Sequence, residues 1–264
     1  GKLGDFGRSF KTRPGAMMII AALFGGPFAS TCYVVGLQMA GSIVVPISAL
    51  CPAIGAILAR FLFRQPLTPR MMLGILICFS ASALIGFSSM GGIEARPHMM
   101  LGLLFGFLAA LGWGIEGCVC GYGVSIIDSE VGITIREVTI GISNLIILVP
   151  ILGWIGQTDG FAMLGKALAD MDSMKWFIVA GFLCYFNFMC WYRGNAMCGA
   201  ALGMACNGAY SFWGPFFCWL ILGVFFGLDG WNMAPVAWVG AVLMVVGIFT
   251  IATNPLALFH RKEQ

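Results

Sequence analysis

Long apolar runs, separated by short breaks that contain Pro, Gly or charged residues, alternate along most of the chain. A bilayer core about 30 Å thick requires roughly 20 apolar residues in a helix. The breaks at 63–70 and 91–98 carry proline and charge, which are typical of turns at a membrane surface. Eight segments satisfy the length requirement: about 15–38, 42–63, 69–89, 99–123, 134–156, 174–195, 200–226 and 234–253.

Composition indicates that these runs cross a membrane rather than fill a soluble core. Of the 264 residues, 60% are hydrophobic and 9% are charged, whereas soluble domains carry roughly 25% charged residues. The sequence therefore predicts an all-α, polytopic membrane helical bundle with eight transmembrane helices. The net charge of +3 is modest and its positive residues flank apolar runs, so we expect no nucleic-acid partner.

The residue types that carry most enzyme chemistry are sparse. The ten cysteines are scattered through apolar runs, and the two histidines, His98 and His260, lie outside these runs at no metal-ligand spacing. We therefore expect no metal, no other cofactor and no catalytic residue, so the protein is not predicted to be an enzyme.

The distribution of Lys and Arg predicts the orientation, because these residues collect on the cytoplasmic side. With the N-terminus in the cytoplasm, Arg96, Lys166 and Lys175 are the three basic residues on the outer side, and the other 11 of the 14 lie inside. An even number of spans with both ends cytoplasmic follows. Residues 161–174 are interpreted as an amphipathic helix on the outer surface, with a polar loop as the alternative.

Two pairs of segments are similar to each other. "CYVVGLQMAG" (32–41) aligns with "CWYRGNAMCG" (190–199) at an offset of 158, and 67–86 aligns with 233–252 at an offset of 166. The charge distribution gives the first span and its partner opposite directions through the membrane. Inverted repeats are typical of transporters, in which two like halves rock around a central site. The alternative is chance similarity between Gly-rich apolar helices.

At these residues the chain resembles the EamA-type branch of the drug/metabolite transporter superfamily. The resemblance rests on 33–86, with its proline-bearing span and short basic hairpin, and on "WYRGNAMCGAALGMA" (191–205). The second copy departs from it, because its proline is Pro215 rather than an equivalent of Pro52.

Members of this superfamily have ten spans in two inverted five-span halves, and the present spans resemble the third to the tenth. The resemblance thus implies that the first two spans are absent from this sequence. Residues 1–95 would hold three spans of the N-terminal half, and residues 96–264 would hold the five spans of the C-terminal half. It also implies a location in the bacterial inner membrane.

Glu116 lies within the apolar run 99–123. Ionisable residues inside a membrane are costly and usually functional, so we interpret Glu116 as a substrate-binding and proton-coupling carboxylate. The resemblance adds that it corresponds by symmetry to the essential glutamate in the first span of small multidrug resistance proteins. The alternative is a structural pair with Arg136 or Arg193 near the cytoplasmic end of the span.

Amides and aromatic residues of the sixth and seventh predicted spans complete the candidate substrate site. Aromatic walls with amides suit an amphipathic metabolite or an organic cation, although helix packing is the commoner role of such residues. The candidates besides Glu116 are Asn187, Trp191, Asn207, Tyr210 and Trp213.

These features together predict a secondary active transporter that moves a small organic metabolite or drug by alternating access. Export and exchange with protons are the favoured direction and coupling, and a homodimer is compatible with the sequence. One alternative is a sugar or nucleotide-sugar importer or exchanger of the same superfamily. A membrane-embedded lipid-modifying enzyme is another, for which only 126–137 offers an acidic cluster, and a non-transporting scaffold subunit is a third.

Overall fold

The computed structural model describes residues 2–40, 44–64, 67–89, 98–200, 203, 207, 213, 216–227 and 235–252, and these are helical apart from short turns. The predicted all-helical fold is therefore confirmed for this part of the chain. The elements are α1 (Lys2–Ser9), α2 (Arg13–Leu23), η1 (Phe24–Ala29), α3 (Ser30–Ala40), α4 (Val44–Ser48), α5 (Cys51–Phe63), α6 (Pro69–Ser89), α7 (Met99–Gly123), α8 (Ser129–Ser143), η3 (Asn144–Leu148), α9 (Val149–Ile155), α10 (Gly160–Ala169), α11 (Met171–Cys198), η4 (Cys218–Phe225) and α14 (Pro235–Ala252).

Four continuous helices are long and apolar enough to cross a membrane, namely Arg13–Ala40, Met99–Gly123, Ser129–Ile155 and Met171–Cys198. They coincide with the first, fourth, fifth and sixth predicted spans. The second, third and eighth predicted spans correspond to shorter apolar helices, and much of the seventh, 200–226, lies outside the described residues. The structure thus confirms a multi-helix membrane bundle, whereas the count of eight spans stays a prediction.

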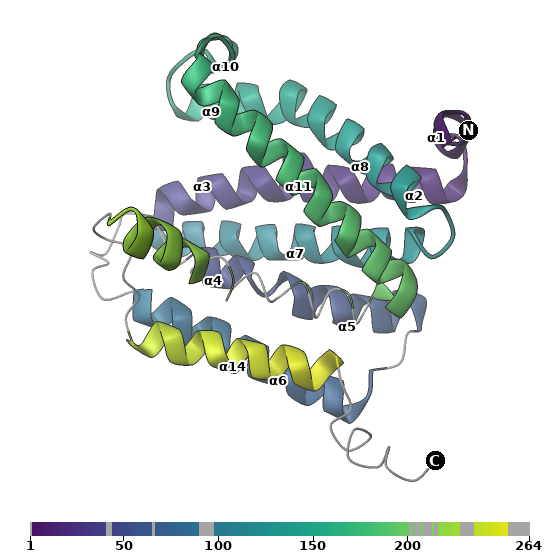
Figure 1. Cartoon of the computed structure of the whole chain (residues 1–264), viewed down its shortest axis with the longest axis vertical. Coiled ribbons are helices and arrows are strands. Elements are labelled where there is room, and N and C mark those ends of the chain that lie inside the picture. The colour runs from purple at the N-terminus through teal and green to yellow at the C-terminus, as the bar shows by residue number, and fades with distance from the viewer. Residues whose placement is uncertain are drawn as a thin grey trace.

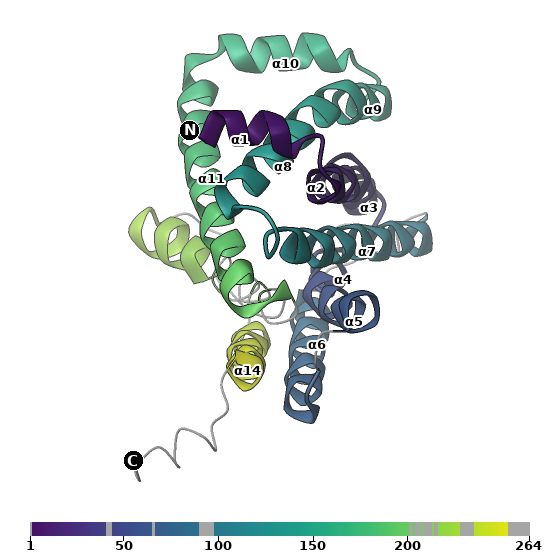
Figure 2. The ribbon, with the colours of Figure 1, turned by 90° about the vertical axis from the view of Figure 1, so that its right-hand side faces the viewer.

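Helix α7 lies between α2–α3 on one side and α5 on the other, as both views show (Figures 1 and 2). Its glycines permit this close packing. An added Cβ at Gly102 would lie 2.6 Å from Ala40 Cβ, and one at Gly114 would lie 2.7 Å from Ile54 Cγ2. Small residues let membrane helices approach closely and gain van der Waals contact, so the glycine-rich face places α7 at the centre of the bundle.

Helices α6 and α14 pack against each other, and each begins at a proline, Pro69 and Pro235. Proline suits the first turn of a helix because that position needs no N–H donor. The Cys78 thiol donates to the Met244 carbonyl over 3.8 Å, and a Cβ at Gly74 would lie 2.7 Å from the Gly247 carbonyl. Residue numbers rise along α6 as they fall along α14, so the two helices run in opposite directions across this contact.

Two of the long helices contain a π-helical segment. Pro27 lies within η1, where it lacks the N–H that a regular α-helix requires. Segment η3 begins at Asn144 and contacts η1. Such π-bulges occur frequently at functional sites. An apolar groove of about 410 Å³ lies beside them, lined by Leu23, Pro27, Phe28, Thr31, Cys32, Ile147 and Ile151.

The predicted surface helix 161–174 is two helices rather than one. Helix α10 ends at Ala169, and Asp170 then adopts an extended conformation with φ −83° and ψ 109°. The Asp170 side chain accepts from the first backbone N–H groups of α11, so α11 begins three residues before its predicted start at 174. Figure 2 shows α10 lying across the ends of α9 and α11; its position at the membrane surface stays a prediction.

Candidate functional site

The α7–α8 hairpin places an acidic and a basic side chain opposite each other. Asp128 caps α8 by accepting from the backbone N–H of Glu130 at 2.9 Å and of Val131 at 3.3 Å. Glu116 lies seven residues before the end of α7, and Arg136 lies seven residues after the start of α8. Since each residue adds about 1.5 Å along a helix, the two side chains reach the same level of the hairpin.

Glu116, Arg136 and Glu137 form an acid–base cluster, in which Glu116 and Arg136 are buried and the Glu137 side chain is 35% exposed. Arg136 Nε donates to Glu116 Oε1 at 2.6 Å, and the two side chains are only 8% and 5% exposed. Arg136 Nη1 donates to Glu137 Oε1, also at 2.6 Å. The guanidinium carbon lies 3.9 Å from the centre of the Phe188 ring of α11, a cation–π contact. One guanidinium therefore compensates two carboxylates.

A glycine of η1 completes one wall of the cluster. The Glu116 carboxylate lies so close to Gly25 that a Cβ at this position would overlap it. Trp113 Nε1 donates to the Gly25 carbonyl at 3.0 Å, which ties the π-segment to α7. Any larger residue at position 25 would displace either the carboxylate or the segment.

The C-terminal part of α11 covers the cluster from the other side. Tyr192 is fully buried and interacts with Cys120, Arg136 and Glu116. The Trp191 ring lies 5.2 Å from that of Tyr192, and Trp191 Nε1 donates to the Gly203 carbonyl at 3.2 Å. The site is thus formed where η1, α7, α8 and α11 meet, and it places aromatic rings beside the charges.

The structure brings together only some of the predicted site residues. Glu116 is buried and paired with Arg136, the partner that the sequence offered as a structural alternative, whereas Arg193 is exposed. Trp191 reaches the cluster through Phe188 and Tyr192.

The other candidates are not shown beside Glu116. Asn187 is exposed on α11, Asn207 is partly buried, Trp213 is 49% exposed and packs against Phe216 and Phe217, and Tyr210 lies outside the described residues. Whether these residues bind substrate stays a prediction.

Sequence reasoning missed Glu137 and Gly25 as parts of the site. The adjacency of Arg136 and Glu137, both near the start of an apolar run, was a signal for the first. Gly25 gave no signal, because its role depends on the approach of a side chain from another helix.

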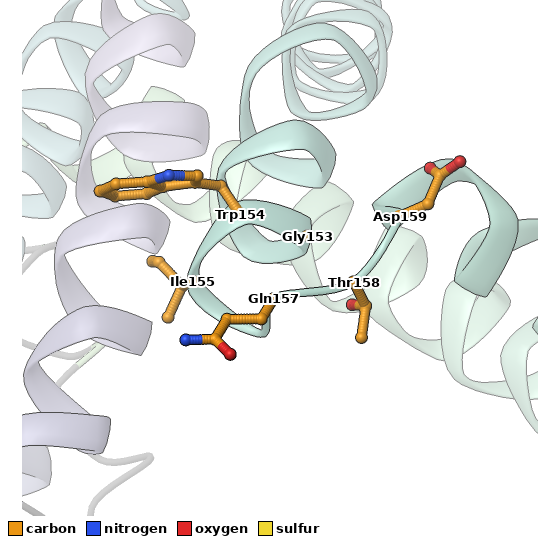
Figure 3. A pocket seen from close by; sticks show the side chains of 6 residues that line it. All are labelled: Gly153, Trp154, Ile155, Gln157, Thr158 and Asp159. Carbon is orange, nitrogen blue, oxygen red and sulfur yellow. The ribbon is translucent and has the colours of Figure 1, made fainter.

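A second concave region lies at the turn between α9 and α10, with a volume of about 830 Å³ (Figure 3). Its side chains do not converge, since Trp154 and Asp159 project to opposite sides. Asp159 already accepts from the N–H groups of Phe161 and Ala162. Within the part of the chain that the structure describes, no group of three or more His, Cys, Asp or Glu residues could hold a metal ion.

Long apolar helices around an acid–base cluster define a polytopic helical membrane protein. Residues 5–87 match the model of the EamA-like transporter family, which confirms the predicted resemblance to EamA-type transporters of the drug/metabolite transporter superfamily. The matched region includes Gly25 and the whole of η1.

Comparison with solved structures supports the fold. Eleven chains match. One of them, described only as the crystal structure of a protein, is 14% identical, covers 92% of this chain and 90% of its own, and has a TM-score of 0.51. No curated protein matches the chain. Residues 5–87 are thus similar to the EamA-like transporter family, and the fold of the chain is shared with a solved structure at low identity.

Proposed function

We propose that this chain is a secondary active transporter that exports a small organic cation in exchange for protons, and that the acid–base cluster is where the two compete. The observation that carries the proposal is the charge of the cluster. Glu116 and Glu137 contribute two negative charges and Arg136 contributes one positive charge. In the ionised state the cluster is therefore left with one negative charge.

Glu116 and Arg136 are buried, whereas the Glu137 side chain is 35% exposed. A net charge at a site that is largely inside a membrane bundle is costly unless it is compensated. One proton on Glu116, or one ammonium-type group beside it, would neutralise the cluster. A proton and the solute cation cannot occupy the Glu116 carboxylate together. Binding of the solute therefore favours release of the proton, and binding of the proton favours release of the solute. This competition is the minimum requirement for exchange of a cation against protons.

The aromatic neighbours suit an organic cation rather than a metal ion. Phe188 already holds a guanidinium over its ring, and Trp191 and Tyr192 lie in sequence on the same helix. Cation–π attraction contributes about 0.5–2 kcal/mol per contact, so a solute cation that displaces Arg136 from Glu116 could use the same rings. The remaining sequence candidates, Asn187, Asn207, Tyr210 and Trp213, would then contact the rest of the solute.

Alternating access is supported by the relation between the two sequence copies. Cys78 and Met244 are separated by 166, the offset of the second alignment, and they contact each other between α6 and α14. A contact between equivalent positions of two antiparallel helices is what a pseudo-two-fold axis in the membrane plane produces. Halves related in this way could rock about that contact and open the cluster to either side in turn.

A nucleotide-sugar exchanger is less consistent with the cluster. An anionic solute would require a surplus of positive charge, whereas Arg136 is shared by two carboxylates. The lipid-modifying enzyme and the scaffold subunit predict no exchange of solute at all.

Counterflow in proteoliposomes tests the proposal, with ethidium as the probe because it is a planar aromatic cation. Vesicles that contain the full chain and unlabelled ethidium should accumulate labelled ethidium with saturable kinetics. Glu116→Gln should abolish transport driven by a pH gradient, since a glutamine cannot exchange a proton. Asp172→Asn, at a position that is 86% exposed at the start of α11, is the matched control. Absence of saturable counterflow, or unchanged transport in Glu116→Gln at every pH, would refute the proposal.

A further inference from the structure

Two polar side chains of α11 are completely buried near the acid–base cluster. Tyr192 and Asn195 are both 0% exposed and lie one helical turn apart, on the same face. Among the residues that the structure describes, both polar atoms of the Asn195 amide have no hydrogen-bond partner, and the Tyr192 hydroxyl has only the Cys120 thiol beside it. A buried polar atom without a partner costs about 1–3 kcal/mol, and proteins commonly satisfy such atoms with buried water.

Tyr192 and Asn195 lie beside the part of α7 between Glu116 and its C-terminal end. Tyr192 interacts with Cys120, one turn beyond Glu116, as well as with Glu116 and Arg136. Asn195 lies at Gly121, where an added Cβ would be 3.6 Å from the amide nitrogen. The polar atoms therefore continue from the carboxylate to the last turn of α7. Figure 1 shows that the C-terminal ends of α7 and α11 meet in this region.

Glycines let the backbone approach the Asn195 amide closely in this region. An added Cβ at Gly203 would overlap Asn195 Oδ1, and one at Gly121 would lie 2.6 Å from Ala200 Cβ. The indole of Trp191 holds Gly203 in place by donating to its carbonyl. Both glycines therefore bring backbone, rather than an apolar side chain, next to the amide.

We propose that Tyr192 and Asn195 bind water between α7 and α11, and that this water carries protons between Glu116 and the C-terminal ends of the two helices. Water binding follows from the buried polar atoms alone, whereas the proton route rests on the proposed function, because it requires Glu116 to exchange a proton.

A hydroxyl and a water molecule each donate and accept, and an amide does both with different atoms. An excess proton that enters at the helix ends can thus pass along O–H bonds to the Glu116 carboxylate. Tyr192 and Asn195 end the transfer unchanged. The charged groups that face the route are Glu116 on α7 and Arg136 and Glu137 on α8, and the thiol of Cys120 lies beside it.

Water binding can be tested without any transport. In the full chain, reconstituted in lipid bilayers and labelled with ¹⁵N in its Asn side chains, water-edited solid-state NMR measures how fast magnetisation passes from water to each amide. The Asn195 amide should receive it within the fast phase of buried bound water, and Asn195→Leu identifies the signal. Slow transfer, at the rate of the dry helix core, would overturn the proposal.

The proton route predicts that loss of the water-binding side chains slows proton movement but not solute counterflow. Solute-for-solute counterflow at equal pH needs no net proton transfer, so ethidium counterflow should stay at the wild-type rate in Asn195→Leu. Proton movement driven by ethidium, followed with pyranine trapped in the vesicles, should fall at least about tenfold, which corresponds to about 1.4 kcal/mol of added barrier.

Tyr185→Phe removes a hydroxyl from the same helix at a position that is 40% exposed, and it should change neither rate. An equal loss of both rates in Asn195→Leu, or no loss in either, would overturn the route. If the wild-type chain shows no counterflow, the proposed function fails, and the NMR measurement still decides whether water is bound.

Discussion

Two helices that the sequence predicts to be equivalent, Arg13–Ala40 and Met171–Cys198, differ in almost everything except their extent. Each has 28 residues, and their bounds are related by the same offset of 158 that aligns 32–41 with 190–199. Their N-caps, Thr12 and Asp170, are related by this offset too. The repeat in the sequence therefore extends to the start, length and end of the helix, which supports an origin of both from one unit.

Burial separates the two copies. In the first helix 44% of the most apolar stretch is buried, whereas in the second none of it is. A Cβ at Gly36 would lie 3.0 Å from the Gly102 carbonyl, while its equivalent, Gly194, has nothing within 4 Å among the described residues. The same sequence pattern thus specifies a helix in both places, but contact with the glycine face of α7 determines which copy becomes core.

The acid–base cluster joins the two copies, so its disruption should affect both. Arg136→Ala would leave Glu116 buried without its partner, and breaking a buried ion pair in this way costs about 3–5 kcal/mol. We expect a corresponding fall in the free energy of unfolding, measured by thermal unfolding in detergent micelles. The double variant Glu116→Gln with Arg136→Met should recover part of the loss; a double variant less stable than Arg136→Ala would contradict this account.

Leucine at the equivalent glycines, Gly36 and Gly194, should change the stability of the protein by different amounts. Gly36→Leu inserts a side chain against the backbone of α7, and overpacking of this kind costs about 1–3 kcal/mol. Gly194→Leu should leave stability close to that of the wild type, because its Cβ meets no neighbour among the residues that the structure describes. Thermal unfolding of the two variants side by side measures the difference, and equal shifts would show that burial does not distinguish the copies.

The tie between η1 and α7 should contribute less. Trp113→Phe removes the hydrogen bond to the Gly25 carbonyl and should lower the free energy of unfolding by about 1 kcal/mol. Trp176→Phe, at a position of α11 that is 68% exposed, is the control and should have no measurable effect. If both variants unfold alike, the indole hydrogen bond does not stabilise the π-segment.

The N-caps of the two helices, Thr12 and Asp170, predict the smallest difference in stability. Only the first turn of α11, which Asp170 caps, should change its stability with pH. Hydrogen bonds from the Ser173 hydroxyl, then from backbone N–H groups, lower the pKa of Asp170. The cap of α11 therefore stabilises the helix above the unfolded-state pKa of about 3.9 and loses this contribution as the pH falls through the lower folded-state pKa.

Thr12 cannot titrate, so the first turn of α2 should not respond. Amide hydrogen-exchange protection of Ser173 should decrease between about pH 5 and about pH 3 once intrinsic rates are corrected, while that of its equivalent, Gly15, stays constant. A parallel decrease at both positions would indicate general unfolding instead.

The helices were predictable because lipid imposes a simple requirement, a long apolar run with every backbone group bonded inside the helix. Glu116 was predictable as exceptional for the same reason. Its pairing with Arg136 remained one of two alternatives, since residue spacing gives the level of a side chain in a hairpin but not which neighbour it faces. Gly25 and Asn195 could not be recognised, because their roles come from contacts with other helices.

The sequence by itself determined approximately where the long helices lie, that they suit a bilayer, and that a carboxylate lies inside one of them. Only the tertiary structure decided that this carboxylate shares an arginine with Glu137, that the first copy of the repeat is core, and that the second meets α7 mainly at its C-terminal end. The physical reason is that hydrophobicity acts on each helix separately, whereas close packing and charge pairing depend on which helices meet.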